Sequence, residues 1–150
     1  MDVHWVIFVG MLLLIGVGCT TVSDDLTFPL EPRINIVEIS SDTLTEFSES
    51  LVLTLEYEDG DGDLGSADPD VNSIFVRDQR LAKPDGYYLA PLSPEGTRIS
   101  ITGRLQLELN PTFRLGNGAT ETTEFSITLV DRAGNESNVV RTGPILIIEP

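Results

Sequence analysis

The densest group of residues able to do chemistry lies in residues 56–65, which read EYEDGDGDLG. Three aspartates alternate here with glycines, and glycine allows the positive φ angles by which a tight turn brings carboxylate oxygens together. Oxygen ligands with no nitrogen or sulfur nearby favour Ca²⁺ over transition metals. We therefore predict a calcium site made by Asp59, Asp61 and Asp63, with Asp70 as a further ligand.

The spacing of these aspartates is only partly that of an EF-hand loop. Asp59, Asp61 and Asp63 take positions 1, 3 and 5, and Asp70 takes position 12. Leu64, however, stands where that loop needs glycine, Asp70 is one methylene shorter than the bidentate glutamate, and no helical pattern flanks the run. We expect a calcium loop between two strands. The alternative is an exposed turn whose Asp-Gly pairs only reverse the chain and stay solvated.

A second polar cluster, DRAGNESN, occupies residues 131–138. Its interpretation is mostly structural, because Asp and Asn side chains bond to nearby backbone and Gly134 suits a tight bend. A role for Asp131 or Asn135 as an ion ligand is the alternative.

The only cysteine, Cys19, ends an apolar run, VHWVIFVGMLLLIGVG, at residues 3–18. A short apolar segment, a small residue and then cysteine are typical of a bacterial lipoprotein signal, in which the thiol is alkylated with diacylglycerol and becomes the new N-terminus. The run is shorter than the roughly 20 apolar residues of a membrane-spanning helix. Two departures are the lack of a basic residue before the run and Gly16 where leucine is usual. We predict lipidation of Cys19; the alternatives are an uncleaved anchor and a buried thiol in an N-terminal helix.

The acidic run Ser23-Asp24-Asp25 follows the cysteine closely. It resembles the export signal that surface-exposed lipoproteins of the Bacteroidota carry after their lipidated cysteine. The resemblance implies an outer-membrane protein that faces outward. The alternative is a solvated tether that happens to be acidic.

Composition excludes several classes of function. The chain of 150 residues has 24 acidic and 9 basic residues and a net charge of −15, which becomes −14 if residues 1–18 are removed. Such a chain is repelled by nucleic acid and attracts cations. The only histidine, His4, lies before Cys19, so no Ser-His-Asp triad or histidine-rich zinc site can form afterwards. Carboxylate catalysis needs a large cleft, which a small domain seldom supplies. We therefore expect no enzyme and no nucleic-acid binding.

The elements that must position these residues read as strands, because apolar residues alternate at period two. We expect seven strands: residues 33–40, 50–57, 73–78, 86–90, 98–109, 123–130 and 138–148. Gly103 is expected to mark a bend or bulge in the longest of them. This pattern predicts an all-β fold, an antiparallel two-sheet sandwich of the immunoglobulin-like kind. The predicted organisation is a signal peptide at 1–18, an acidic, proline-containing tether at 19–32 and the sandwich at 33–150.

Both polar clusters also carry a family resemblance. EYEDGDGDLG followed by IFVRDQR, and later FSITLVDRAGNESNVVRTGPI, resembles a group of small uncharacterised lipoproteins of the Bacteroidota, over most of residues 33–148. The D-x-A-G-N-x-S turn is also similar to the penultimate turn of bacterial immunoglobulin-like and hyalin-repeat-like domains. The resemblance implies location and fold and little chemistry. Where such relatives carry cysteines, this chain has Asn110-Pro111 and a C-terminus of Ile147-Ile148-Glu149-Pro150, so a disulfide there would be missing.

The leading hypothesis is therefore a lipid-anchored, non-enzymatic binding or structural module of the outer membrane or cell surface, stabilised by Ca²⁺, with a protein or glycan partner. The alternative is a glycan-binding or glycan-processing accessory lipoprotein. Glycan platforms favour aromatic faces, and after Cys19 the chain offers no tryptophan and only Tyr57, Tyr87 and Tyr88.

Overall fold

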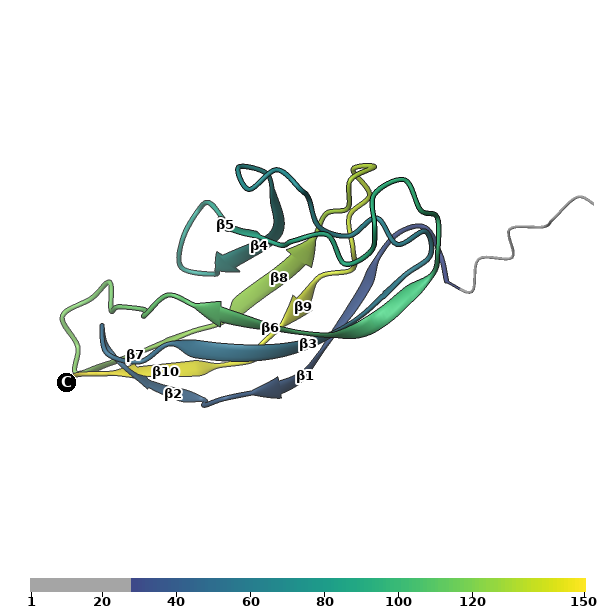
Figure 1. Ribbon diagram of the computed structural model, residues 1–150. Coiled ribbons are helices and arrows are strands. Elements are labelled where there is room, and N and C mark those ends of the chain that lie inside the picture. The colour runs from purple at the N-terminus through teal and green to yellow at the C-terminus, as the bar shows by residue number, and fades with distance from the viewer. Residues whose placement is uncertain (1–27) are drawn as a thin grey trace, which may run out of the picture.

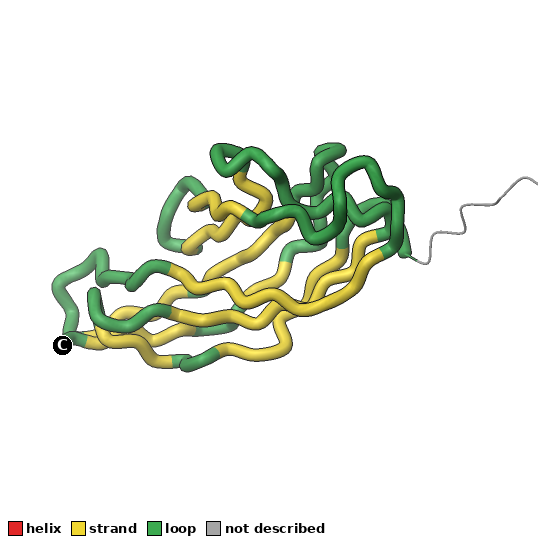
Figure 2. The backbone as a smooth tube through the Cα atoms, viewed as in Figure 1, coloured by secondary structure: helices red, strands yellow, loops and turns green. Residues whose placement is uncertain are grey.

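A computed structural model describes residues 28–150; Cys19, the expected signal peptide and most of the expected tether lie outside this part of the chain. The described residues form strands and loops without a helix, as Figure 2 shows. The part of the chain from residue 28 onward thus includes no helix with the length and apolar character needed to cross a bilayer. The strands are β1 (Arg33–Ile39), β2 (Thr43–Thr45), β3 (Leu51–Asp59), β4 (Asn72–Asp78), β5 (Asp85–Tyr88), β6 (Ile101–Leu109), β7 (Thr120–Thr123), β8 (Phe125–Leu129), β9 (Val140–Arg141) and β10 (Ile145–Ile148).

The strands form two layers of a sandwich (Figure 1). One layer is the sheet β1-β3-β6. The other combines β5-β4-β8-β9 with β2-β10-β7, because β7 runs into β8 with only Glu124 between them, and three residues separate β9 from β10. Strands β1, β3 and β6 take the places of strands A, B and E of an immunoglobulin-like sandwich, and β4, β8 and β9 take those of strands C, F and G. The predicted all-β, two-sheet fold is confirmed.

One strand pair departs from the antiparallel pattern. β2 was not expected from the sequence, and it pairs parallel to β10, with Leu44 beside Ile147. Its three residues, TLT, are too short to show a period. Leu44 is nevertheless 3% exposed, so this edge strand contributes to the core.

The predicted bulge at Gly103 is wrong. Gly103 pairs with Tyr57 in an unbroken register between β3 and β6. A Cβ atom at this position would lie 2.7 Å from the hydroxyl oxygen of Tyr57, so the glycine leaves room for that side chain. The register shift in this sheet instead lies in β1, between Ile36 and Glu38.

The core lies between the layers and comes from the alternation that predicted the strands. Its fully buried side chains are Leu51, Leu53 and Leu55 of β3, Ile127 and Leu129 of β8, Ile145 and Ile147 of β10, and Leu64 of a loop. The strand expected over residues 98–109 begins only at Ile101. Ile99 precedes the strand: its side chain is 52% exposed, and its N–H donates to the carbonyl oxygen of Asp61 in the acidic loop.

Candidate metal centre

The acidic loop begins at Asp59, the last residue of β3, and bends sharply over residues 60–65. Gly62 has a φ of +72°, and a Cβ there would lie 2.3 Å from the carbonyl oxygen of Ile99, so only glycine fits. Hydrogen bonds hold the bend: Ser100 Oγ donates to the Gly60 carbonyl at 2.7 Å, and Ser93 Oγ donates to the Gly62 carbonyl. The loop therefore has a defined backbone path.

Leu64 fixes the loop to the core. Its side chain is completely buried, and its N–H donates to Asp59 Oδ2 at 3.1 Å. The residue that breaks the EF-hand pattern is thus an apolar anchor for a bend between strands. This agrees with the expectation of a loop that is not an EF-hand.

The bend brings three of the four predicted ligands together. Asp59, Asp61 and Asp63 each offer one carboxylate oxygen, and these oxygens lie within 4.8 Å of one another. The Oδ1 atom of each residue is buried and has no hydrogen-bond partner among residues 28–150. Asp59 is 0% exposed. Burying a carboxylate oxygen without a partner costs free energy, and a cation is the partner that would satisfy all three atoms at once.

The electrostatics of this cluster are those of crowded, partly desolvated carboxylates. Burial raises the pKa of Asp59, and the charges of Asp61 and Asp131 raise it further. Burial also raises the pKa of Asp63, to about 6, with added repulsion from Asp131, Asp61 and Asp59. Arg98 relieves little of this repulsion, because its Nε lies 4.0 Å from Asp61 Oδ2 and its side chain is 55% exposed.

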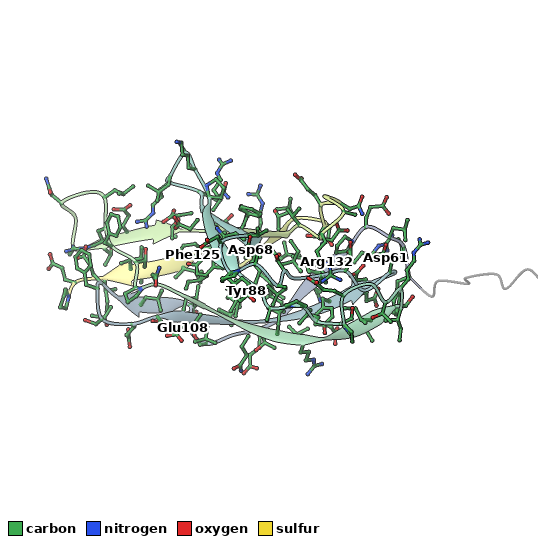
Figure 3. All side chains as sticks on the ribbon, turned by 45° about the horizontal axis from the view of Figure 1, so that its top comes forward. Asp61, Asp68, Tyr88, Glu108, Phe125 and Arg132 are labelled. Carbon is green, nitrogen blue, oxygen red and sulfur yellow. The ribbon has the colours of Figure 1, made fainter. Side chains whose placement is uncertain are left out.

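The second polar cluster, residues 131–138, donates hydrogen bonds to the acidic loop. Asp131 is buried, and its two oxygens accept hydrogen bonds from the N–H and the side-chain amide of Asn135, each at 2.8 Å. The same turn donates to Asp63, through the N–H of Ala133 to Oδ2 at 3.1 Å and the N–H of Arg132 to the carbonyl at 3.2 Å. Figure 3 shows Arg132 and Asp61 at the same end of the sandwich. The structural interpretation of this turn is confirmed; its contact with the acidic loop was not expected.

Asp70 lies outside the group of three aspartates. The chain leaves the loop at Ser66, whose N–H bonds to the carbonyl of Leu89, and then turns at the surface. There Asp68 Oδ1 accepts the N–H of Asp70 at 3.0 Å, and both residues are exposed. Asp68 is far from Asp61 in Figure 3. Asp70 therefore serves an exposed turn in this structure.

The tyrosines considered for a glycan platform are dispersed. Tyr57 lies on β3 beside Gly103, whereas Tyr87 and Tyr88 lie on β5 of the other layer and, as neighbours in a strand, point to opposite faces. The stacked aromatic pair among the described residues is instead Phe47 and Phe113, with ring centroids 5.9 Å apart and both rings exposed. Neither phenylalanine was singled out by the sequence pattern.

No protein-family model matches this chain, and neither a curated protein nor a solved structure matches it. The chemistry of the site follows from the atoms that it offers. The cluster offers carboxylate oxygens and backbone groups, and residues 28–150 contain neither histidine nor cysteine. Such a donor set suits a hard divalent cation.

Proposed function

We propose that this protein is a non-enzymatic, lipid-anchored module of the outer membrane or cell surface whose β-sandwich is stabilised by Ca²⁺ bound to Asp59, Asp61 and Asp63. The observation that carries the calcium site is Asp59. Its side chain is completely buried, one of its oxygens has no hydrogen-bond partner among the described residues, and an oxygen of each of two other carboxylates lies within 4.8 Å. The lipid anchor is supported by Cys19 and the apolar run before it.

Calcium suits the site better than a transition metal because every side-chain donor is an oxygen. The carboxylate oxygens lie within 4.8 Å of one another. This is about the distance between two oxygens on opposite sides of a calcium ion, whose Ca–O bonds are about 2.3–2.6 Å long. Carbonyl oxygens and water commonly complete the six to eight ligands of calcium. Extracellular calcium modules bind with dissociation constants of about 10⁻⁴–10⁻³ M, and we expect an affinity in this range for a module of the cell surface.

The bound ion stabilises the end of the sandwich at which the acidic loop lies. Asp59 belongs to β3, Asp61 and Asp63 to the bend, and Asp63 is bonded to the 131–135 turn. Calcium neutralises the repulsion within this junction and ties the three segments together. The module then presents a rigid sandwich to a partner on the cell surface.

Isothermal titration tests the binding directly. The full-length protein, purified in detergent and freed of metal with EDTA, is titrated with CaCl₂ and, separately, with MgCl₂. We expect one saturable calcium site and weaker magnesium binding. An Asp61→Asn, Asp63→Asn variant should lose the site, whereas the matched Asp68→Asn, Asp70→Asn variant should retain it. Absence of saturable calcium binding by the unmodified protein would overturn the proposal.

A further inference from the structure

Strand β6 forms an open edge of the sandwich. It is the last strand of the sheet β1-β3-β6 and, within residues 28–150, pairs only with β3. The register with β3 is unbroken over all nine residues, from Leu109 beside Leu51 to Ile101 beside Asp59. Figure 1 shows β6 as a long strand at the margin of its layer. The middle of β6, where Gln106 pairs with Thr54, lies five residues along β3 from Asp59 of the proposed calcium site.

The backbone groups that face outward can be assigned from the neighbouring strand. Val52 bonds to Ser40 next to β1, accepting from its N–H at 2.9 Å and donating to its Oγ at 3.0 Å. Backbone direction alternates along a strand, so Leu53 bonds toward β6, and its partner Leu107 bonds toward β3. The residues of β6 whose N–H and C=O groups point to the open side are therefore Thr102, Arg104, Gln106 and Glu108, and their side chains are exposed.

This edge lacks most of the devices that usually prevent strands from joining. Proteins protect edges with charged side chains, above all lysine, and with bulges, prolines or short strands. The two charged side chains of β6, Arg104 and Glu108, are of opposite sign. The sequence of β6, ITGRLQLEL, contains no proline or lysine, and its pairing contains no bulge. Beyond the end of β6, the Tyr87 hydroxyl accepts a hydrogen bond from the backbone of Asn110. The segment around Gln106 is thus free to accept another strand.

The sequence of this segment is complementary to itself. When a second copy of β6 runs antiparallel with Gln106 opposite Gln106, Arg104 of each copy lies opposite Glu108 of the other. Opposite charges in directly facing positions stabilise a strand pair. Arg104 already lies 3.3 Å from Glu56 on β3, so the pairing makes a row of acidic, basic and acidic side chains across three strands. On the inner face, Leu105 lies opposite Leu107.

We propose that two copies of this protein associate through β6, antiparallel and centred on Gln106, to form one continuous six-stranded sheet. The contact is twofold symmetric, so each copy uses the same surface. The outward groups of Arg104, Gln106 and Glu108 supply about six backbone hydrogen bonds. Glu108 lies in the half of the molecule away from Asp61 (Figure 3), so the acidic loops stay clear of the contact.

Charge reversal tests both the contact and its register. Analytical ultracentrifugation of the full-length protein in detergent should show a dimer. Arg104→Glu and Glu108→Arg should each raise the dissociation constant about tenfold or more, because like charges then face each other twice. An equimolar mixture of the two variants, and the double variant that exchanges the charges, should both recover the dimer. A monomeric wild type, or a dimer unaffected by both single reversals, would overturn the proposal.

Disulfide trapping in the native membrane provides a second measurement. Facing residues of a hydrogen-bonded antiparallel pair have Cα atoms about 5.5 Å apart, within the range that a disulfide spans. Gln106→Cys should therefore form a covalent dimer on mild oxidation. The control is Glu38→Cys, an exposed position of β1 at the opposite margin of the same sheet. Equal crosslinking of both variants, or none at position 106, would contradict the pairing.

Discussion

The N–H of Leu64 donates a hydrogen bond of 3.1 Å to Oδ2 of Asp59, and both residues are completely buried. This contact joins the core to the acidic loop, because the apolar side chain holds the bend while its backbone holds one carboxylate oxygen. The other oxygen of Asp59 has no hydrogen-bond partner among the described residues. Packing and ion binding are therefore coupled at this point.

Replacing Leu64 with alanine should weaken both properties. Truncating a fully buried leucine costs about 3 kcal/mol of unfolding free energy, and the loosened bend should lower calcium affinity as well. Leu51→Ala is the matched control, because Leu51 is 1% exposed at the opposite end of β3. It should cost similar stability in urea titrations and leave calcium affinity unchanged. Equal calcium affinities in the two variants would show that the packing of Leu64 does not affect ion binding.

Calcium binding should weaken as the pH falls below about 6. Asp63 has a pKa raised to about 6 by burial and by neighbouring carboxylates, so protons compete with the ion there. In EDTA, where no calcium is bound, the contribution of Asp63 to folding stability has the opposite pH dependence and is larger at low pH. The folded state holds this proton more tightly than the unfolded state, so the contribution of Asp63 to stability falls as the pH rises from about 3.8 to about 6.

Calcium titrations and thermal melts in EDTA at several pH values measure both effects. Asp63→Asn should remove the falling contribution from the melts in EDTA. A calcium affinity that stays constant from about pH 7.5 to about pH 5 would contradict the assignment of Asp63 as a ligand, because its carboxylate must lose the proton before it binds the ion.

The strands followed from the sequence because their signal is local. Alternation over residues 50–57 is enough to place Leu51, Leu53 and Leu55 in the core. The support of the candidate site is not local: the bond from Ala133 to Asp63 joins residues 70 positions apart. Neither the acidic loop nor the 131–138 cluster contains a sequence pattern that predicts its contact with the other. The composition of a loop predicts which atoms can bind an ion, whereas the fold decides which of them lie close together. The sequence therefore groups Asp70 with three aspartates from which the structure separates it.

Breaking a buried ion pair away from the loop should cost much stability. Arg80 contacts Asp78 at 2.5 Å and Glu121 at 2.8 Å, and the Arg80 and Asp78 side chains are 13% and 8% exposed. Burial alone would raise the pKa of Asp78, but hydrogen bonds from Arg80 and Thr123 lower it overall. Arg80→Ala leaves that carboxylate without its cation and should cost about 3–5 kcal/mol in urea unfolding.

The control for this prediction is the exposed pair of Arg141 and Glu124, which are 3.9 Å apart. Arg141→Ala should cost less than about 1 kcal/mol, because solvent screens exposed pairs. A loss of similar size in both variants would show that the buried network contributes no more than a surface pair.

The anchor is tested at Cys19, which lies outside the described residues. Cys19→Ser should leave an unprocessed precursor that no longer incorporates labelled fatty acid, because the thiol is the site of alkylation. The measurement is metabolic labelling followed by gel analysis of the precursor and processed forms. Equal labelling of the wild type and the variant would refute lipidation at this residue.

Thermal unfolding with and without calcium tests the central claim most directly. At a tenfold excess over the dissociation constant, an ion that binds only the folded state adds about 1.4 kcal/mol, which raises the melting temperature by about 5 °C in a domain of this size. The account predicts such a rise in millimolar Ca²⁺, its reversal by EDTA, and its loss in the Asp61→Asn, Asp63→Asn variant. Identical melting temperatures of the wild type in calcium and in EDTA would contradict it and identify residues 59–65 as a solvated turn.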